Sequence, residues 1–131
     1  MSYDAYFTDL MRQAGRQRVD ILLVPADEPT PDLVPFDTQG AMFRGIENGC
    51  SVLRSTLEGL TMGADYQGNV LSSMNYYTTQ ENRTTITHIP TRGVRTVYAL
   101  AGDWFAYLSI LLSMGMIAWA VVERVRRART R

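Results

Sequence analysis

Few side chains in this sequence could act as nucleophiles, bases or metal ligands. The chain of 131 residues has one cysteine, Cys50, one histidine, His88, and no lysine, because all thirteen basic residues are arginine. A single cysteine excludes an intrachain disulfide, and together with a single histidine it excludes a Cys/His metal cluster. We therefore expect neither a metal nor another cofactor.

For each candidate we favour a structural interpretation. Cys50 begins an apolar segment, and free cysteines are among the most buried residue types, so we expect a buried, unreactive thiol. His88 lies in an alternating segment without a nearby carboxylate in sequence, which predicts a surface or half-buried position. Glu47 follows Arg44 by three residues, the spacing of an ion pair on one helix face.

The first third of the chain reads as helix, strand and loop. Residues 5–17 place apolar side chains at helical spacing and predict an amphipathic helix. Residues 19–25, VDILLVP, are a short run rich in branched side chains, which predicts a strand buried on both faces, as in the centre of an α/β sheet. Residues 26–35 hold three of the five prolines and predict a loop.

The middle of the chain predicts a second helix and further strands. A helix is expected at 36–48, capped by Asp37 or Thr38 and ended by Gly49, with Ala41, Phe43 and Ile46 on its inner face. A strand follows at 50–57, and a turn at Gly59 leads to a hairpin at 60–74 with its own turn at 66–69. Residues 75–83 are polar and irregular, and 84–90 alternate as a half-buried strand.

The longest apolar segment is residues 104–122, nineteen residues without a charge. As a helix it would be roughly 28 Å long, close to the hydrocarbon thickness of a bilayer. Trp104, Tyr107 and Trp119 lie near its ends, where amphipathic rings favour the membrane interface. We expect a transmembrane helix at 104–122, because core helices of soluble domains rarely run this long without a polar face.

Charge is divided between the two parts of the chain. Residues 1–103 hold eight Arg against twelve Asp and Glu, a net charge of −4, and residues 104–131 hold five Arg against Glu123, a net charge of +4. This division shows no nucleic-acid footprint. By the positive-inside rule, the basic tail at 123–131 is cytoplasmic and the globular part lies outside the membrane. Alternatively, the tail binds anionic lipid headgroups, on the same face as the globular part.

This topology and the element order predict a particular architecture. Residues 1–103 form one domain, an incomplete α/β sandwich with helices on a mixed sheet, of which one sheet face needs a partner. An external globular part also requires a signal peptide or earlier membrane helices, and MSYDAYFTDLMRQAG at the start is neither. We therefore expect further sequence upstream.

Several segments in this order resemble the second half of the nitrilase (carbon–nitrogen hydrolase) superfamily. VDILLVP, FRGIENG and VLRSTLEGLTMGADYQGNVL are similar to the family's "ADILL-P", "RAIENG" and "LVRATNTGISAVIDPQG". RGVRTVYALAGDWF before an apolar helix and a basic tail resembles one branch, the apolipoprotein N-acyltransferases, in which "T-Y-x-x-x-G-D-W" precedes the last helix. The resemblance runs from Tyr3 to about Val122 and implies a partial nitrilase-type sandwich followed by one transmembrane helix.

The resemblance also implies a chemistry. The family uses a cysteine nucleophile, a glutamate base and a lysine, with a second acid just after the cysteine. In this branch a phospholipid donates an acyl group to the N-terminal cysteine of a lipoprotein, outside the cytoplasmic membrane. The implied partners are therefore membrane lipid, a phospholipid donor and a lipoprotein acceptor.

Matching the family motif to this chain leaves the site incomplete. Ser2 stands at the position of the nucleophile and Asp4 at that of the neighbouring acid, while the glutamate and lysine positions lie upstream of Met1. A serine hydroxyl is a poor nucleophile without an activating base, and Asp4 could instead be a charge favoured at a helix N-terminus. By analogy, Arg54 and Glu58 line the site.

Three hypotheses follow for function. In the first, this chain is the C-terminal part of a membrane-bound nitrilase-type N-acyltransferase, and is inactive alone. In the second, it is non-catalytic, either a degenerate remnant or a membrane-anchored subunit. In the third, it is half of a split enzyme whose second chain supplies the glutamate, the lysine and the remaining strands.

Overall fold

The computed structural model describes residues 3–27, 30–77 and 84–129, in two compact units. Residues 1–100 form a globular unit and residues 101–131 a second one. Each is described by itself.

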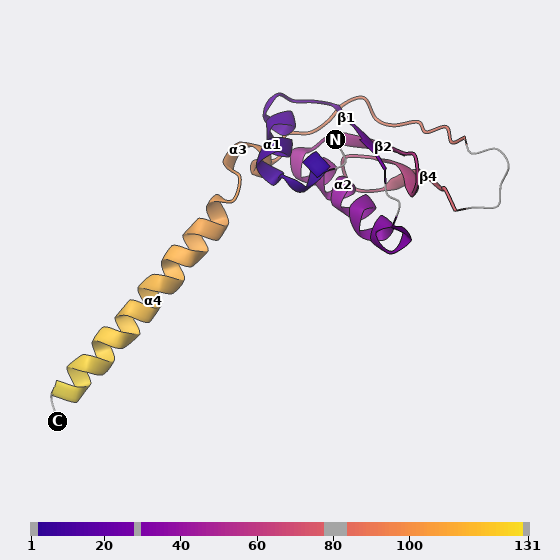
Figure 1. Ribbon diagram of the computed structural model, residues 1–131. Helices are drawn as coiled ribbons and strands as arrows, with labels where there is room; N and C mark the ends of the chain where they lie inside the picture. The colour runs from indigo at the N-terminus through magenta and orange to yellow at the C-terminus, as the bar shows by residue number, and fades with distance from the viewer. Residues whose placement is uncertain (1–2, 28–29, 78–83, 130–131) are drawn as a thin grey trace. The chain divides into compact units, whose positions relative to one another are not determined.

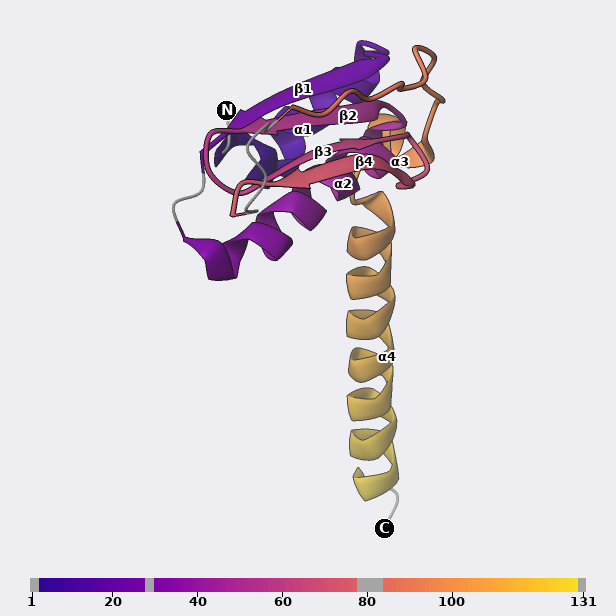
Figure 2. The same ribbon diagram turned by 90° about the vertical axis from the view of Figure 1, so that its right-hand side faces the viewer.

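A four-stranded mixed sheet forms the centre of the globular unit (Figures 1 and 2). Its strands lie in chain order: β1 (Ile21–Ala26), β2 (Ser51–Thr56), β3 (Leu60–Ala64) and β4 (Val70–Asn75). β1 and β2 are parallel, with Val24 opposite Arg54, and the other pairs are antiparallel. The parallel pair requires a crossover, and helix α2 (Val34–Asn48) supplies it. Helices on a mixed sheet were the architecture predicted from the sequence.

Helix α2 covers one face of this sheet and carries the main core contacts. Its buried face repeats at helical spacing and consists of Val34, Thr38, Ala41, Gly45 and Asn48. Ala41 packs with Val24 of β1 and Val52 of β2 in the core. A Cβ on Gly45 would lie 2.5 Å from Val52 Cγ2, so the missing side chain is what lets the helix approach β2.

Two details of α2 differ from the prediction. The helix begins at Val34, with Pro35 in its first turn, where the fixed φ of proline is tolerated, so neither Asp37 nor Thr38 is the cap. Phe43 is half exposed rather than on the inner face, because the buried positions 41 and 45 place residue 43 on the opposite side of the helix. Gly49 ends the helix as predicted, in the left-handed conformation with φ 69°.

Helix α1 (Thr8–Arg16) packs against α2, within the predicted range of residues 5–17. It follows a short 3-10 helix, η1 (Tyr3–Tyr6), and a second one, η2 (Pro31–Leu33), occupies part of the predicted proline loop. A Cβ on Gly15 would lie 2.6 Å from Asn48 Oδ1, so α1 and α2 approach closely there.

The other face of the sheet is only partly covered, and this corrects two predictions. β1 is an edge strand, and Leu23 is 59% exposed, so the strand is not buried on both faces. Residues 84–90 form no strand, and Ile86 is 81% exposed. They alternate in exposure, but two of the three half-buried side chains are threonines, Thr85 and Thr87, and the third is Ile89. Thr87 contacts Ser72 of β4 and occupies the space above Gly63. The segment therefore crosses the sheet instead of joining it.

The β3–β4 hairpin turns where the sequence predicts, at residues 66–69. One carboxylate organises this turn: Asp65 Oδ1 accepts hydrogen bonds from the backbone N–H groups of Gln67 and Asn69 at 2.9 and 2.8 Å. The hydrogen bond from the Asn69 side chain has the largest effect on the pKa of Asp65, and together with the backbone bonds it lowers that pKa.

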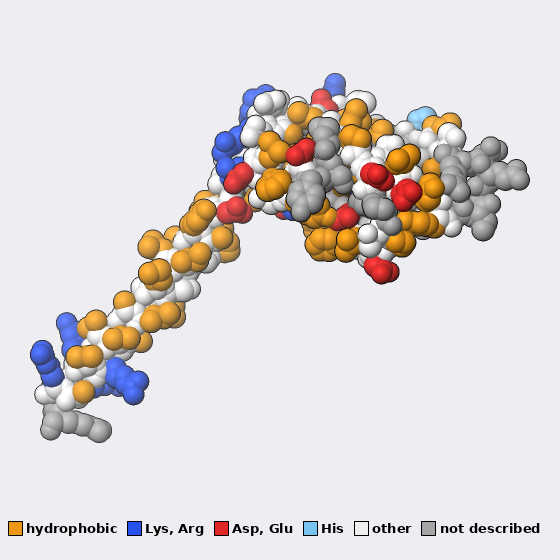
Figure 3. All heavy atoms as spheres, viewed as in Figure 1, with side chains coloured by type: hydrophobic (Ala, Val, Ile, Leu, Met, Phe, Trp, Pro, Cys, Tyr) orange, Lys and Arg blue, Asp and Glu red, His pale blue; other side chains and the backbone are white. Residues whose placement is uncertain are grey.

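The second unit contains one long helix, α4 (Trp104–Arg129), which follows the short helix α3 (Val97–Ala101). α4 is long and apolar enough to cross a membrane. It includes the predicted segment 104–122 and continues to Arg129, so the described part of the basic tail is helical. Orange apolar side chains follow the helix in Figure 3, and blue arginines gather at its C-terminal end.

Candidate functional site

The segment that carries the two predicted site residues lies at the start of the chain. Ser2 is outside the described residues. Asp4 lies in η1, is half-buried, and its carbonyl accepts a hydrogen bond from the N–H of Phe7 at 3.1 Å. η1 packs on α2, so the crossover helix determines where Asp4 lies.

A small recess opens directly beside η1. Its lining comes from four elements: Ala5 and Tyr6 of η1, Val24 of β1, Asp37, Gly40 and Ala41 of α2, and Arg54 of β2. Its volume is about 10 Å³, the space of roughly one water molecule. The recess therefore admits a single ligand atom, such as one oxygen, and not an acyl chain.

Arg54 forms the polar floor of this recess and is only 1% exposed. One guanidinium nitrogen, Nη1, donates to the carbonyl oxygen of Leu60 at 2.8 Å and to Thr38 Oγ1 at 3.3 Å. Burial lowers the pKa of Arg54, because desolvation penalises its charged form. A guanidinium nevertheless stays charged at neutral pH, so the recess has a buried positive group at its base.

Asp37 brings a carboxyl group to the same recess. Burial raises the pKa of Asp37, and among the described residues no hydrogen bond reaches its buried Oδ1 atom. Beside it, the ring of Tyr6 stacks on Phe36 with centroids 6.4 Å apart. The recess thus combines a carboxyl whose pKa is raised by burial with a buried guanidinium, which could donate a hydrogen bond to one oxygen atom.

The other candidates lie away from the recess. Cys50 is fully buried, as predicted, and burial raises its pKa to about 11. His88 is exposed and Glu58 is half-buried, and neither lines the recess. Arg54 does line it, and its place in the site of an intact enzyme stays a prediction.

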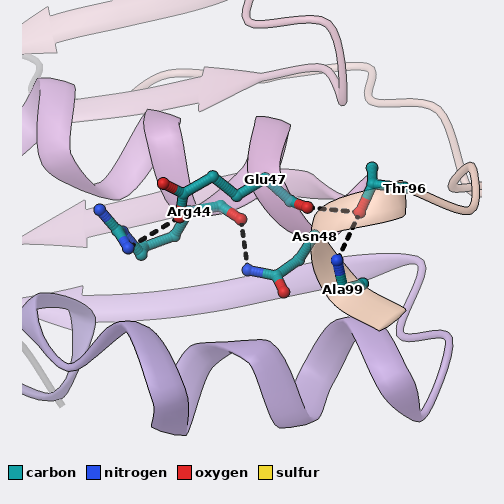
Figure 4. Close-up of polar contacts among 5 residues, drawn as sticks. All are labelled: Arg44, Glu47, Asn48, Thr96 and Ala99. Atoms are coloured by element: carbon teal, nitrogen blue, oxygen red, sulfur yellow. Dashed lines mark hydrogen bonds and ion pairs between the residues drawn. The ribbon is translucent and has the colours of Figure 1, made fainter. Parts of the chain in front are cut away.

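Glu47 takes part in a structural cluster at the C-terminal end of α2 (Figure 4). It pairs with Arg44 at 2.7 Å, which confirms the predicted ion pair. Its backbone carbonyl accepts a hydrogen bond from Thr96 Oγ1, and Thr96 Oγ1 in turn accepts one from the N–H of Ala99 at 3.1 Å. Glu47 follows Asp37 by ten positions, roughly 15 Å along the helix, so it lies away from the recess.

Sequence reasoning did not identify Asp37 and Tyr6 as members of this site. Asp37 has the residue type and position of a helix cap, so its pattern indicated a local role. Tyr6 had no chemical signal beyond following Asp4 by two residues.

Comparison with known proteins gives one consistent group of relatives. The chain is 35% identical to the apolipoprotein N-acyltransferase of Vibrio cholerae over 132 aligned positions, 98% of this chain and 25% of the relative. It is 29% identical to that of Vibrio vulnificus, over 91% of this chain and 24% of the relative, and 28% identical to that of Photobacterium profundum, over 98% and 25%. The chain thus spans about a quarter of the length of these relatives. No family model and no solved structure matches it.

Proposed function

We propose that this chain, a homologue of apolipoprotein N-acyltransferases over nearly its whole length, acts as part of a membrane-bound nitrilase-type N-acyltransferase. The observation that carries the proposal is the similarity itself, which extends over 98% of this chain in two relatives. The apolar helix α4 agrees with an enzyme that works at a membrane.

The proposed reaction moves an acyl group from a phospholipid to the N-terminal amine of a lipoprotein. An ester bond of the lipid breaks, a lysophospholipid leaves, and an amide bond forms at the acceptor. Ser2 stands at the nucleophile position and Asp4 at that of the neighbouring acid. A serine needs an activating base, and the chain has no lysine, so we expect it to be inactive alone.

A complementation assay tests this proposal. The chain is reconstituted in vesicles with labelled phospholipid and a diacylated lipopeptide, alone or together with the part of the Vibrio cholerae relative that it does not match. We expect no turnover from the chain alone, and turnover from the pair when the chain carries Ser2→Cys, because a thiolate is the better nucleophile. The proposal would be contradicted if the unaltered chain alone showed turnover and Ser2→Ala abolished it. The chain would then be a catalyst by itself.

The second candidate is a non-catalytic protein, a remnant or a membrane-anchored subunit that pairs with another chain. The observation that favours pairing is the uncovered sheet face, where Leu23 is 59% exposed. In the assay above, the unaltered chain and the Ser2→Cys chain are each paired with the remaining part of the relative. Stable binding in both pairs without acyl transfer in either would support the subunit interpretation.

We also propose a topology in the bacterial cytoplasmic membrane. The arginines after residue 122 favour a cytoplasmic C-terminal end, with the globular unit outside. Cys50 is buried, so a cysteine introduced as Arg129→Cys would be the reactive thiol. In spheroplasts we expect a membrane-impermeant maleimide to label Arg129→Cys only after permeabilisation. Labelling in intact spheroplasts would place the C-terminal end outside.

A further inference from the structure

The apolar stretch and the arginine-rich tail belong to one continuous helix, α4. α4 has 26 residues, a length of roughly 39 Å, which exceeds the hydrocarbon core of about 30 Å. Its apolar part ends at Val122, and the helix continues through Arg129. The last two turns therefore extend into the headgroup region while remaining helical, and their side chains keep fixed positions around the helix.

A shallow groove on one side of this helix leads from apolar to charged residues. Met116, Trp119 and Ala120 line its apolar part, and Glu123 and Arg127 close its end. Glu123 Oε1 accepts a hydrogen bond from Arg127 Nε at 3.1 Å. The spacing of four residues from Trp119 to Glu123 to Arg127 places all three on one face.

The charge around this groove is positive despite the glutamate. Residues 123–129 hold four arginines and one glutamate, a net charge of +3. Each helical position turns by about 100°, so Arg124 lies about 100° to one side of Glu123 and Arg126 about 100° to the other side of Arg127. A ligand seated in the groove would therefore meet the Glu123–Arg127 ion pair, flanked by the guanidinium groups of Arg124 and Arg126.

We propose that this groove binds an anionic phospholipid, with an acyl chain along Met116, Trp119 and Ala120 and the headgroup phosphate among Arg124, Arg126 and Arg127. Guanidinium groups bind phosphate oxygens through paired N–H donors. Basic side chains near an anionic membrane surface are attracted to its headgroups. A zwitterionic lipid fits the apolar part equally well but has no net charge for the arginines to attract.

The alternative occupant is another membrane helix. Such a helix would pack against small residues and exclude lipid from Trp119. It would gain nothing from three arginines at the end of the groove unless it carried matching acids. Charge complementarity therefore favours the lipid, and lipid contact at Trp119 separates the two occupants.

Trp119 itself can report the lipid beside it. The chain has two tryptophans, so Trp104→Phe leaves Trp119 as the one fluorophore of its kind. The full chain with this substitution is reconstituted in phosphatidylcholine vesicles containing about one fifth phosphatidylglycerol, a minor share comparable to natural anionic lipid. Bromine, a contact quencher, is placed on the acyl chains of phosphatidylglycerol alone or on an equal amount of phosphatidylcholine alone.

We expect quenching per brominated molecule to be at least about threefold greater for phosphatidylglycerol than for phosphatidylcholine. The triple substitution of Arg124, Arg126 and Arg127 to Gln removes this excess. The matched control, Arg16, Arg92 and Arg95 to Gln, removes three exposed charges from the globular unit and keeps it. Salt at about 0.5 M reduces the excess in the unaltered tail, because it screens headgroup attraction. Vesicle flotation confirms insertion of each variant.

Equal quenching by the two brominated lipids would overturn the proposal, since bulk lipid would then occupy the groove. Weak quenching by both would also overturn it, because protein would cover Trp119. An excess that survives the triple substitution would place the selectivity elsewhere. None of these readouts depends on acyl transfer, so the lipid site and the proposed enzymatic function are tested separately.

Discussion

At the scale of single residues, Asp37 is an acid whose protonation is altered by its position in the recess. Burial raises its pKa, so the folded state binds the proton more tightly than the unfolded chain does. Stability therefore falls as pH rises from the ordinary carboxyl value through the folded value. The helix N-terminus favours a negative charge at this position, so it acts against the increase in pKa that burial causes.

We therefore predict that Asp37→Asn slightly stabilises the globular unit at neutral pH, within the range of about 0.5 kcal/mol that is usual for substitutions outside the core. The gain should shrink as pH falls and vanish below the ordinary carboxyl pKa, where aspartic acid is also neutral. Urea unfolding at several pH values measures this difference. Asp32→Asn, at an exposed acid of η2, is the control and should have little effect. A loss of stability at neutral pH would contradict the prediction.

Cys50 gives a second prediction at this scale. With a pKa of about 11 and no exposed surface, its thiolate fraction at pH 8 is about one in a thousand. We expect Cys50 to react with a maleimide only after the globular unit unfolds, so labelling should follow the denaturant transition. Rapid labelling in native buffer would show that the β2 end of the sheet opens locally.

At the scale of elements, the joint between α2 and the segment after residue 93 holds the globular unit together. Gly49 ends α2 with φ 69°, and a Cβ there would lie 1.9 Å from the carbonyl oxygen of Val94. The N–H of Val94 donates to the carbonyl of Gly49 at 2.7 Å. Neither the conformation nor the approach leaves space for a side chain.

We predict that Gly49→Ala destabilises the globular unit by more than about 2 kcal/mol, since left-handed strain and backbone displacement add. Gly40→Ala is the matched control on the same helix, where no atom lies within 4 Å of the added Cβ. It should stabilise by roughly 0.5–1 kcal/mol through helix propensity. Circular dichroism during urea unfolding compares the two, and equal effects would contradict the role of the joint.

Thr96 fastens the same joint through its side chain. Its hydroxyl donates to the Glu47 carbonyl and accepts from the N–H of Ala99, so it caps α3 and tethers it to α2. Thr96→Val keeps the shape and removes both bonds, and we expect a loss of about 1–2 kcal/mol. Thr91→Val, at an exposed residue, is the control and should change stability little. An unchanged unfolding midpoint for Thr96→Val would exclude this tether.

At the scale of the whole molecule, α4 divides the chain into a part that folds in water and a part suited to lipid. Leu112 lies near the middle of its apolar stretch and is 60% exposed. Leu112→Arg should oppose insertion by about 2.5–3.5 kcal/mol, so the variant should be released by alkaline carbonate while the unaltered chain stays with membranes. Leu112→Ile is the control and should remain inserted. Retention of the arginine variant would indicate that other segments hold the chain at the membrane.

Most elements of this fold were predictable from local signals in the sequence. Gly49 as a helix end, the hairpin turn at 66–69 and the apolar length of 104–122 each depend on residues adjacent in the chain. The Arg44–Glu47 pair likewise follows from helical spacing. Backbone conformation, turn chemistry and apolar length are local properties, so sequence alone determined them.

Tertiary structure decided which apolar faces are covered and which polar groups meet. Leu23 lies in a segment with the pattern of a buried strand and Ile86 in one with the pattern of a half-buried strand. Both side chains are exposed, because burial depends on whether another layer packs there. Asp37 and Arg54 are seventeen residues apart in sequence and meet at one recess only because α2 crosses over β2. Periodicity within a segment contains no information on the distance between segments, so the fold alone revealed that Asp37 and Arg54 line the recess beside η1.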